Sequence, residues 1–291
     1  MSPCTRGTPM SNRSDVPVTP ELLREWGLPD PGDSKKSRGE VVVVGGSRRS
    51  PGAVFLAGEA ALRVGAGRLA VVVPASVDAQ LSVVMPEAAV HALPAEADAP
   101  LEDGPRRSIE SADAVLVGPG FDDPDETRAT LRAVAELDVR CLVLDAYALG
   151  ILPRVDRGSL PRDLILNPNK EEAAILLERD PGDGEPDLEE IARRYDAVVN
   201  CYGRVVAPSG EAWQVPGGGP GLGTSGSGDV LAGAIAGFAA RGIPPAQAAV
   251  WGSWCHARAG DRLTDEIGIG FLARDIPPAL TRVLHELHVE G

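Results

Sequence analysis

The stretch "EVVVVGG", residues 40–46, places four valines in a row directly before two glycines. A continuous β-branched run without polar alternation is typical of a strand that is buried on both faces of a parallel sheet. Similar apolar runs, each ending at or just past Gly, Pro, Asp or Asn, recur at 68–74, 113–120, 139–146 and 163–169. We therefore predict a sheet made mainly of parallel strands.

Stretches with helical spacing lie between these runs, at 52–64, 124–137 and 170–178. Strands that alternate with helices indicate an α/β fold with helices on both faces of the sheet. The segment "RVVAPSGEAWQV" (204–215) instead predicts two strands around a Pro-Ser-Gly turn. From Asp229 to about Leu287 the chain is expected to be largely helical.

The organisation of the chain predicts one domain. No internal repeat is visible in the 291 residues, and the polar stretch 179–190 is typical of a surface loop between helices. Residues 1–16 read as a disordered polar leader, and residues 17–291 as the domain.

Charge and composition exclude several function classes. The formal net charge of −14, without any Lys/Arg-rich block, argues against nucleic acid as a partner. No secretory signal and no run of about 18 apolar residues is present, so we expect no membrane contact. The four cysteines lack zinc-site spacing and read as reduced thiols, so we predict a cytoplasmic protein.

The glycine-rich stretch "GLGTSGSGDVLAGAIAG" (221–237) is the main candidate for a binding site. Gly226, Ser227 and Gly228 precede an apolar helix, so their free N–H groups and the positive helix end predict a phosphate site. The stretch also matches G-x-G-x-x-G, but it lies near the C-terminus and is followed by helices. It is therefore not the dinucleotide-binding fingerprint of a first βα turn.

Asp229 stands at the start of the same helix. A carboxylate in a first helical turn can simply stabilise the helix dipole. Among glycines that expose a phosphate site, it is also placed to accept the proton of a substrate hydroxyl that attacks the phosphate. We predict that Asp229 is the catalytic base.

A second group of candidates lies in "NPNKEE" (167–172), at another strand-to-helix junction. Asn169 and Glu172 are spaced either to hold Mg²⁺ through waters or to cap the helix, and the spacing leaves both readings open. Asp145 ends a strand, where an acid is more often a site residue than a packing choice. His256, on an Ala-rich helix beside tryptophans, reads as a core or interface histidine.

Four motifs resemble one known family. They are "GAVFLAGEAALRVGAGRLAVVVP" (52–74), "VLVGPGF" (115–121), "VLDAYAL" (143–149) and "GSGDVLAG" (226–233). Together they resemble the ATP/ADP-dependent NAD(P)H-hydrate dehydratases of the ribokinase-like superfamily, over nearly the whole chain after the leader. The resemblance implies a three-layer α/β/α sandwich with a mostly parallel central sheet.

The resemblance also implies an activity, which is the removal of water from hydrated NADH or NADPH, driven by ADP or ATP with Mg²⁺. In this scheme Asp229 activates the C6 hydroxyl of the hydrated ring for phosphorylation, and elimination of phosphate restores the dihydronicotinamide. The implied nucleotide and phosphate contacts are Gly203, Gly226, Ser227 and Gly228. The implied contacts with the hydrated dinucleotide are Ala53, Gly120, Asn169 and Asp229, and the candidate metal residues are Asn169 and Glu172.

Two departures from the family pattern keep other functions open. Asn169 stands where the family usually has a substrate-contacting His, and the loop "NCYGRVV" (200–206) keeps Gly203 but lacks the family's lysine. Asn169 and Glu172 would also suit a vitamin or sugar kinase, and the two losses would suit a non-catalytic nucleotide-binding paralogue. By resemblance we expect a homo-oligomer, a tetramer, and a separate epimerase protein as a possible partner.

Overall fold

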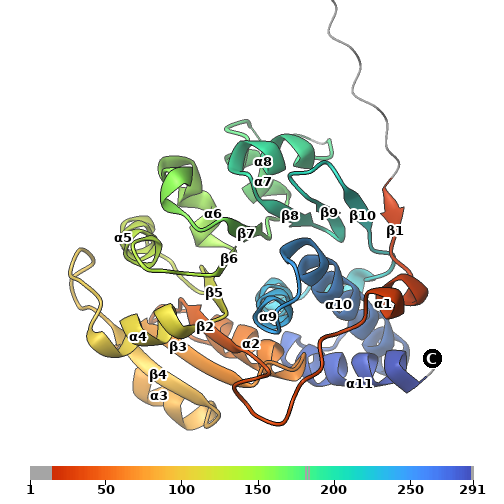
Figure 1. Ribbon diagram of the computed structural model, residues 1–291, viewed down its shortest axis with the longest axis horizontal. Helices are drawn as coiled ribbons and strands as arrows, with labels where there is room; N and C mark the ends of the chain where they lie inside the picture. Colours follow the sequence, from red (N-terminus) through yellow and green to blue (C-terminus); the bar gives the residue numbers. More distant parts are fainter. Residues whose placement is uncertain (1–14, 181, 183, 290–291) are drawn as a thin grey trace, which may run out of the picture.

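The computed structural model describes residues 15–180, 182 and 184–289. In this part of the chain, ten strands form one sheet in the order β1-β10-β9-β8-β7-β6-β5-β2-β3-β4. Within it, β9 runs antiparallel to both of its neighbours, and the other neighbouring pairs are parallel. The predicted mostly parallel sheet is therefore confirmed (Figure 1).

The strands are β1 (Val16–Pro17), β2 (Glu40–Val44), β3 (Arg68–Pro74), β4 (Ala88–Leu93), β5 (Ala114–Val117), β6 (Cys141–Leu144), β7 (Asp163–Leu166), β8 (Val198–Cys201), β9 (Arg204–Val206) and β10 (Ala212–Gln214). The α-helices are α1 (Pro20–Trp26), α2 (Gly52–Arg63), α3 (Asp78–Val84), α4 (Asp103–Ser111), α5 (Pro124–Ala135), α6 (Tyr147–Ile151), α7 (Lys170–Leu176), α8 (Leu188–Tyr195), α9 (Ser227–Ala240), α10 (Pro245–Ile267) and α11 (Ile276–Val289). Among the described residues, none of these helices is both long and apolar enough to cross a membrane.

Helices cover both faces of the sheet. The valines of β2 are fully buried and alternate between two cores: Val41 and Val43 face one, while Val42 and Val44 face the other. The first core is closed mainly by α2, α9, α10 and α11, and the second mainly by α4 to α8 (Figure 1). The run at 40–46 is thus apolar throughout because both of its faces are covered.

Helices α2 and α9 touch through their backbones. A β-carbon on Gly233 would lie 2.0 Å from the carbonyl oxygen of Ala57, and one on Gly237 would lie 2.7 Å from that of Ala61. Such distances leave no room for any side chain, so glycine is needed at both positions. The contact fixes α9, whose first turn carries Ser227, Gly228 and Asp229, firmly against α2.

Most of the expected elements are present. The five apolar runs became β2, β3, β5, β6 and β7, and segment 204–215 forms the antiparallel pair β9 and β10. Strands β4 and β8 were not predicted. The expected leader lies outside the described residues for 1–14, and its end needs correction: Asp15 binds Arg204, and Val16 pairs with Trp213 in β1. These contacts anchor the last two leader residues to the sheet edge.

Candidate functional site

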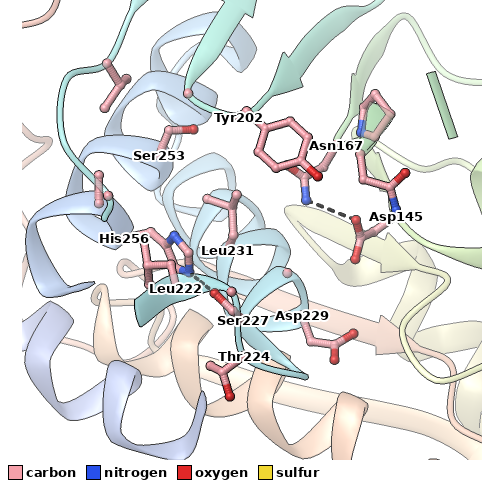
Figure 2. A pocket seen from close by; sticks show the side chains of 18 of the residues that line it. Asp145, Asn167, Tyr202, Leu222, Thr224, Ser227, Asp229, Leu231, Ser253 and His256 are labelled. Atoms are coloured by element: carbon pink, nitrogen blue, oxygen red, sulfur yellow. Dashed lines mark hydrogen bonds between the residues drawn. The ribbon is translucent and has the colours of Figure 1, made fainter. Parts of the chain in front are cut away.

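A pocket of about 630 Å³ lies at the carboxyl ends of β6, β7 and β8, beside the start of α9 (Figure 2). Its walls come from segments far apart in the sequence: 145–146, 167–172, 202–203, 215–231 and 253–257. This is where ligands bind in open parallel sheets. The structure therefore gathers most of the predicted site residues in one place.

The first turn of α9 forms one wall of the pocket. The helix is preceded by Gly226, whose φ of 94° lies in the left-handed region, and no side chain of the described residues caps its free N–H groups. A β-carbon on Gly228 would meet nothing within 4 Å, so this glycine faces open space. The Ser227 N–H donates to the Thr224 carbonyl oxygen over 3.1 Å, so the N–H groups of Gly228 and Asp229 are the ones left for a ligand. The positive end of the helix favours an anion there.

Ser227, the first residue of α9, is held by a histidine. The Ser227 hydroxyl and the His256 Nε2 atom are 3.0 Å apart, and both side chains are buried. Burial lowers the pKa of His256 to about 4, so the ring is neutral at neutral pH. His256 is buried and hydrogen-bonded, as expected of a core histidine, and it also lines the pocket, where it orients the Ser227 hydroxyl.

Three carboxyl groups face the same pocket. Burial raises the pKa of Asp229 to about 6, with a further contribution from the negative charge of Glu172. Burial also raises the pKa of Glu172, and it raises that of Asp145 well above the ordinary value, with Glu172 and Asp229 adding to the effect. A carboxyl group with a pKa near 6 is suited to take a proton close to neutral pH.

The start of α7 is capped by its own side chains. The Glu172 N–H donates to the Asn169 side-chain oxygen over 2.9 Å, and the Asn169 N–H donates to a Glu172 carboxylate oxygen over 2.9 Å. This is a capping box, which is one of the two readings that the spacing left open. Both residues also line the pocket, so the cap leaves a metal-binding role open.

The turn between β8 and β9 carries Tyr202 and Gly203, both on the pocket wall. Their φ angles of 48° and 79° are those of a two-residue hairpin turn, which glycine favours at its second position. The Tyr202 side chain is 71% exposed, and the Lys170 ammonium lies 5.9 Å from the centre of its ring. Tyr202 lies in the loop where the sequence lacks the family lysine, and Lys170 approaches its ring from the start of α7.

The predicted substrate contacts Ala53 and Gly120 lie together, although neither lines the pocket as described. A β-carbon on Gly120 would be 3.0 Å from the Ala53 β-carbon, so the two residues touch. One helical turn beyond Ala53, Leu56 packs against Gly226, where an added β-carbon would lie 2.6 Å from it. The two sites are therefore neighbours, joined through α2.

The charged side chains that the structure describes on the pocket wall are acidic. Among the described residues, its lining includes Asp145, Glu172 and Asp229 but no lysine and no arginine. No three His, Cys, Asp or Glu side chains of that part of the chain are grouped closely enough to hold a metal by themselves. An anionic ligand would therefore find backbone N–H groups and neutral donors such as the hydroxyls of Thr224 and Ser227 on this wall.

Sequence reasoning missed part of the site. Asp145 was a candidate because it ends a strand, and it does line the pocket, but Asn167 was noted only as part of a motif. Ser253, which also lines the pocket, gave no local signal at all. The one available clue was Asn200, a polar residue inside the otherwise apolar strand β8.

The fold and the pocket together define a class of protein. The structure is similar to a ribokinase-like superfamily protein from Enterococcus faecalis V583, with a TM-score of 0.79 at 24% identity, covering 97% of this chain and 99% of that one. The chain therefore has the ribokinase-like α/β fold, as predicted.

The family follows from closer matches. Residues 41–282 match the family model described as NAD(P)H-hydrate dehydratase, and the chain belongs to this family. The ADP-dependent (S)-NAD(P)H-hydrate dehydratase of Xanthomonas campestris pv. campestris is 44% identical over 285 residues, which cover 93% of this chain and 96% of that protein.

Two further relatives bear on structure and length. The crystal structure of the ADP/ATP-dependent NAD(P)H-hydrate dehydratase from Bacillus subtilis, co-crystallised with ATP and Mg²⁺, has a TM-score of 0.80 at 26% identity and covers 94% of this chain and 100% of that one. The bifunctional NAD(P)H-hydrate repair enzyme of Moorella thermoacetica is 36% identical over 275 residues, or 87% of this chain. The matched region spans 50% of that bifunctional protein.

Proposed function

We propose that this chain is an enzyme that restores NADH and NADPH from their hydrated forms, with ADP as the phosphoryl donor. The observation that carries the proposal is the start of α9, where a first turn without a side-chain cap and the half-buried Asp229 face one pocket. The name of the 44% identical Xanthomonas relative supports both the reaction and the choice of ADP.

In the proposed reaction, the pocket assembles a hydroxyl, a phosphate and a base. The nucleotide phosphates lie against Gly226, Ser227 and Gly228 at the start of α9, and Gly203 contacts the nucleotide from the β8–β9 turn. Ala53, Gly120 and Asn169 contact the hydrated dinucleotide. Asp229 lies between the two ligands and takes the proton of the C6 hydroxyl.

The bonds then change in two stages. The hydroxyl oxygen bonds to the terminal phosphorus of ADP as the bond from that phosphorus to the bridging oxygen breaks, which releases AMP and leaves a phosphate ester on the ring. The carbon–oxygen bond of this ester then breaks to release phosphate. A proton leaves the neighbouring ring carbon, and the double bond of the dihydronicotinamide is restored.

Mg²⁺ fits the donor chemistry of the pocket wall, which offers carboxylate and amide oxygens and no lysine or arginine. Asn169 and Glu172 are the residues that would hold it, together with waters and the nucleotide. Bound there, the ion would neutralise charge on the phosphates. The capping box uses one carboxylate oxygen of Glu172, and the other is not needed for the cap.

Further features of the proposal concern the protein as a whole. We place the enzyme in the cytoplasm, as one domain over 17–291, assembled as a homo-tetramer. Its substrate pool is the hydrated cofactor, with no role for nucleic acid or membrane. Because the chain matches half of the bifunctional Moorella enzyme, a separate epimerase protein is a suitable partner.

The proposal is tested by following the near-ultraviolet absorbance of reduced nicotinamide. Purified protein is mixed with hydrated NADH, Mg²⁺ and either ADP or ATP. The expected result is a nucleotide-dependent rise that is faster with ADP, together with formation of AMP. Hydrated NADPH, measured in parallel, would show which cofactor is preferred.

Two other results would overturn the proposal. A flat trace with a stable phosphorylated product of an added vitamin or sugar would indicate a small-molecule kinase. A flat trace with nucleotide binding intact by calorimetry would indicate a protein that binds without turnover.

A further inference from the structure

Four buried polar side chains form one hydrogen-bonded row beside the pocket. The Ser253 hydroxyl of α10 donates to the Asn200 side-chain oxygen over 2.8 Å, and the Asn200 amide donates to the Asn167 oxygen over 2.7 Å. The Asn167 amide in turn donates to a carboxylate oxygen of Asp145 over 3.0 Å. The row thus crosses the ends of three neighbouring strands, β8, β7 and β6.

Buried polar side chains such as these lower the stability of the fold unless each of them has a hydrogen-bond partner. Asn200 is 0% exposed and sits inside β8, where an aliphatic residue would pack without any polar group to satisfy. An amide buried in such surroundings costs stability unless its partners are all in place. Here its side-chain oxygen and nitrogen each have a partner, supplied by α10 on one side and by β7 on the other.

The row has a direction. Each donor in it points toward Asp145, and each amide is fixed by the neighbour that it accepts from. If Asn167 turned over, its oxygen would face the Asp145 carboxylate, and the two would repel as long as that carboxylate is ionised. The hydroxyl of Ser253, at the far end, supplies the donor that keeps Asn200 and therefore Asn167 in the observed orientation.

The backbone around Asp145 is equally constrained. The next residue, Ala146, has φ 50° and ψ −126°, a strained combination for a residue other than glycine. A β-carbon on Gly118 would lie 1.8 Å from the Asp145 carbonyl oxygen, so the neighbouring strand end presses against it. With one carboxylate oxygen tied to Asn167, the other points toward Asp229 (Figure 2).

We propose that Ser253 and Asn200 are positioning residues that act on the reaction through Asn167 and Asp145. Without the bond from Asn167, the Asp145 side chain could turn to other rotamers. The row holds Asp145 in one orientation beside Asp229 and Glu172, so that the space for a phosphoryl group keeps its shape. This inference rests on the proposed function only for its effect on turnover.

The first test is Ser253→Ala, which removes the terminal donor with the smallest change in volume. We expect kcat to fall between about 10- and 100-fold, as small misplacements near a reacting group do, while KM for ADP and for hydrated NADH stays within about twofold. The matched control is Tyr195→Phe, which removes another buried hydroxyl; it donates to the Leu176 carbonyl, and neither residue lines the pocket. The control should lose stability and keep kcat, and an unchanged kcat in Ser253→Ala would overturn the proposal.

A double-mutant cycle separates positioning from a general structural role. If Ser253 acts through Asp145, then adding Ser253→Ala to Asp145→Asn should cause no further loss of kcat, although it should still lower the melting temperature. If the second substitution lowers kcat by the same factor in both backgrounds, Ser253 acts independently of Asp145 and the proposal fails.

A measurement without turnover distinguishes failure of this proposal from failure of the proposed function. Side-chain amide hydrogens of Asn167 and Asn200 should exchange slowly with solvent in the free protein, as seen by NMR, and at least tenfold faster in Ser253→Ala. Fast exchange in the unmodified protein would overturn the row itself. Slow exchange in a protein that does not restore hydrated NADH would instead leave the row standing and remove the proposed activity.

Discussion

Two helices begin at the same pocket, and they begin in opposite ways. At the start of α7, Asn169 and Glu172 satisfy each other's backbone N–H groups. At the start of α9, Gly226 offers no side chain, the Ser227 N–H donates to the Thr224 carbonyl oxygen, and the N–H groups of Gly228 and Asp229 are left for a ligand. Both helix starts carry the positive end of a helix dipole, so the unused N–H groups are what distinguishes the proposed anion site at α9.

The two starts also treat their carboxylates differently. Glu172 is tied into its cap by the Asn169 N–H. Among the described residues, no backbone N–H donates to the Asp229 carboxylate in this way, and burial raises its pKa to about 6. One acid therefore stabilises a helix, and the other has the pKa that the proposed proton transfer needs. The following predictions test this contrast, beginning with the largest expected effect.

Asp229→Asn is the substitution with the largest expected effect on the contrast between the two helix starts. The variant should keep its fold and its nucleotide affinity while turnover falls by a factor of about 10² to 10⁴, the usual contribution of a general base. Turnover is read from the recovery of nicotinamide absorbance, and affinity from calorimetry. Asp125→Asn, in the first turn of α5, is the matched control and should leave turnover unchanged. Normal turnover in Asp229→Asn would remove this residue from the mechanism.

The pH dependence tests the same acid without mutation. Only ionised Asp229 can accept a proton, and its pKa in the folded protein is raised to about 6. As pH falls below 6, kcat/KM should therefore drop by about tenfold per pH unit, while activity is retained above 6. A profile that stays flat down to pH 4.5, in a protein shown by circular dichroism to be folded there, would contradict this assignment.

Gly228→Ala would close the open start of α9. No atom lies within 4 Å of the added methyl group, so the fold should survive, and stability should stay equal or rise by up to about 1 kcal/mol. The methyl group would, however, occupy the space of a phosphate. We expect nucleotide affinity to fall about tenfold or more, in line with about 1.5–3 kcal/mol for a hydrogen bond to a charged group.

Gly150→Ala, in α6, is the control for that substitution, because its β-carbon also meets nothing within 4 Å but lies outside the pocket lining. Equal nucleotide affinity in both variants would mean that the phosphate lies elsewhere.

Asn169→Ala would open the closed start of α7. Loss of this cap should lower the free energy of unfolding by about 0.5–2 kcal/mol, as measured by denaturant titration. Asp123→Ala, which removes the cap of α5, should cost a similar amount without changing turnover. If Asn169→Ala lowers turnover and Asp123→Ala does not, Asn169 has a role beyond its cap. If stability does not change, the capping box contributes nothing measurable.

Much of the fold could be predicted from local pattern. Runs such as 40–46 can be recognised as strands because burial on both faces excludes polar residues from them. The alternation of these strands with helices then predicts that helices cover both faces of the sheet. Strand β4 was missed because it lies at the sheet edge, where its residues are only partly buried and less uniformly apolar. Strand β8 is short and is interrupted by Asn200, so its apolar signal is weak.

The candidate site divides in the same way. The start of α9 was predicted because its glycines and Asp229 are consecutive in the sequence. The row from Ser253 to Asp145 was not, since its members are separated by 22, 33 and 53 residues and meet only through the sheet topology. The spacing of Asn169 and Glu172 was consistent with a helix cap and with a metal site. The fold shows the cap, and a structure with a bound ligand is needed to test the metal site.

The contact between α2 and α9 makes the enzyme vulnerable to inherited change at residues that do not line its pocket. At Gly233 and Gly237 even one methyl group would collide with the backbone of α2. A substitution there would push apart the helix that carries Asp229 and the helix that carries Ala53. Random mutagenesis should therefore find that Gly233 and Gly237 tolerate substitution as poorly as the pocket residues do. Alleles altered at these glycines should lose activity first at elevated growth temperature.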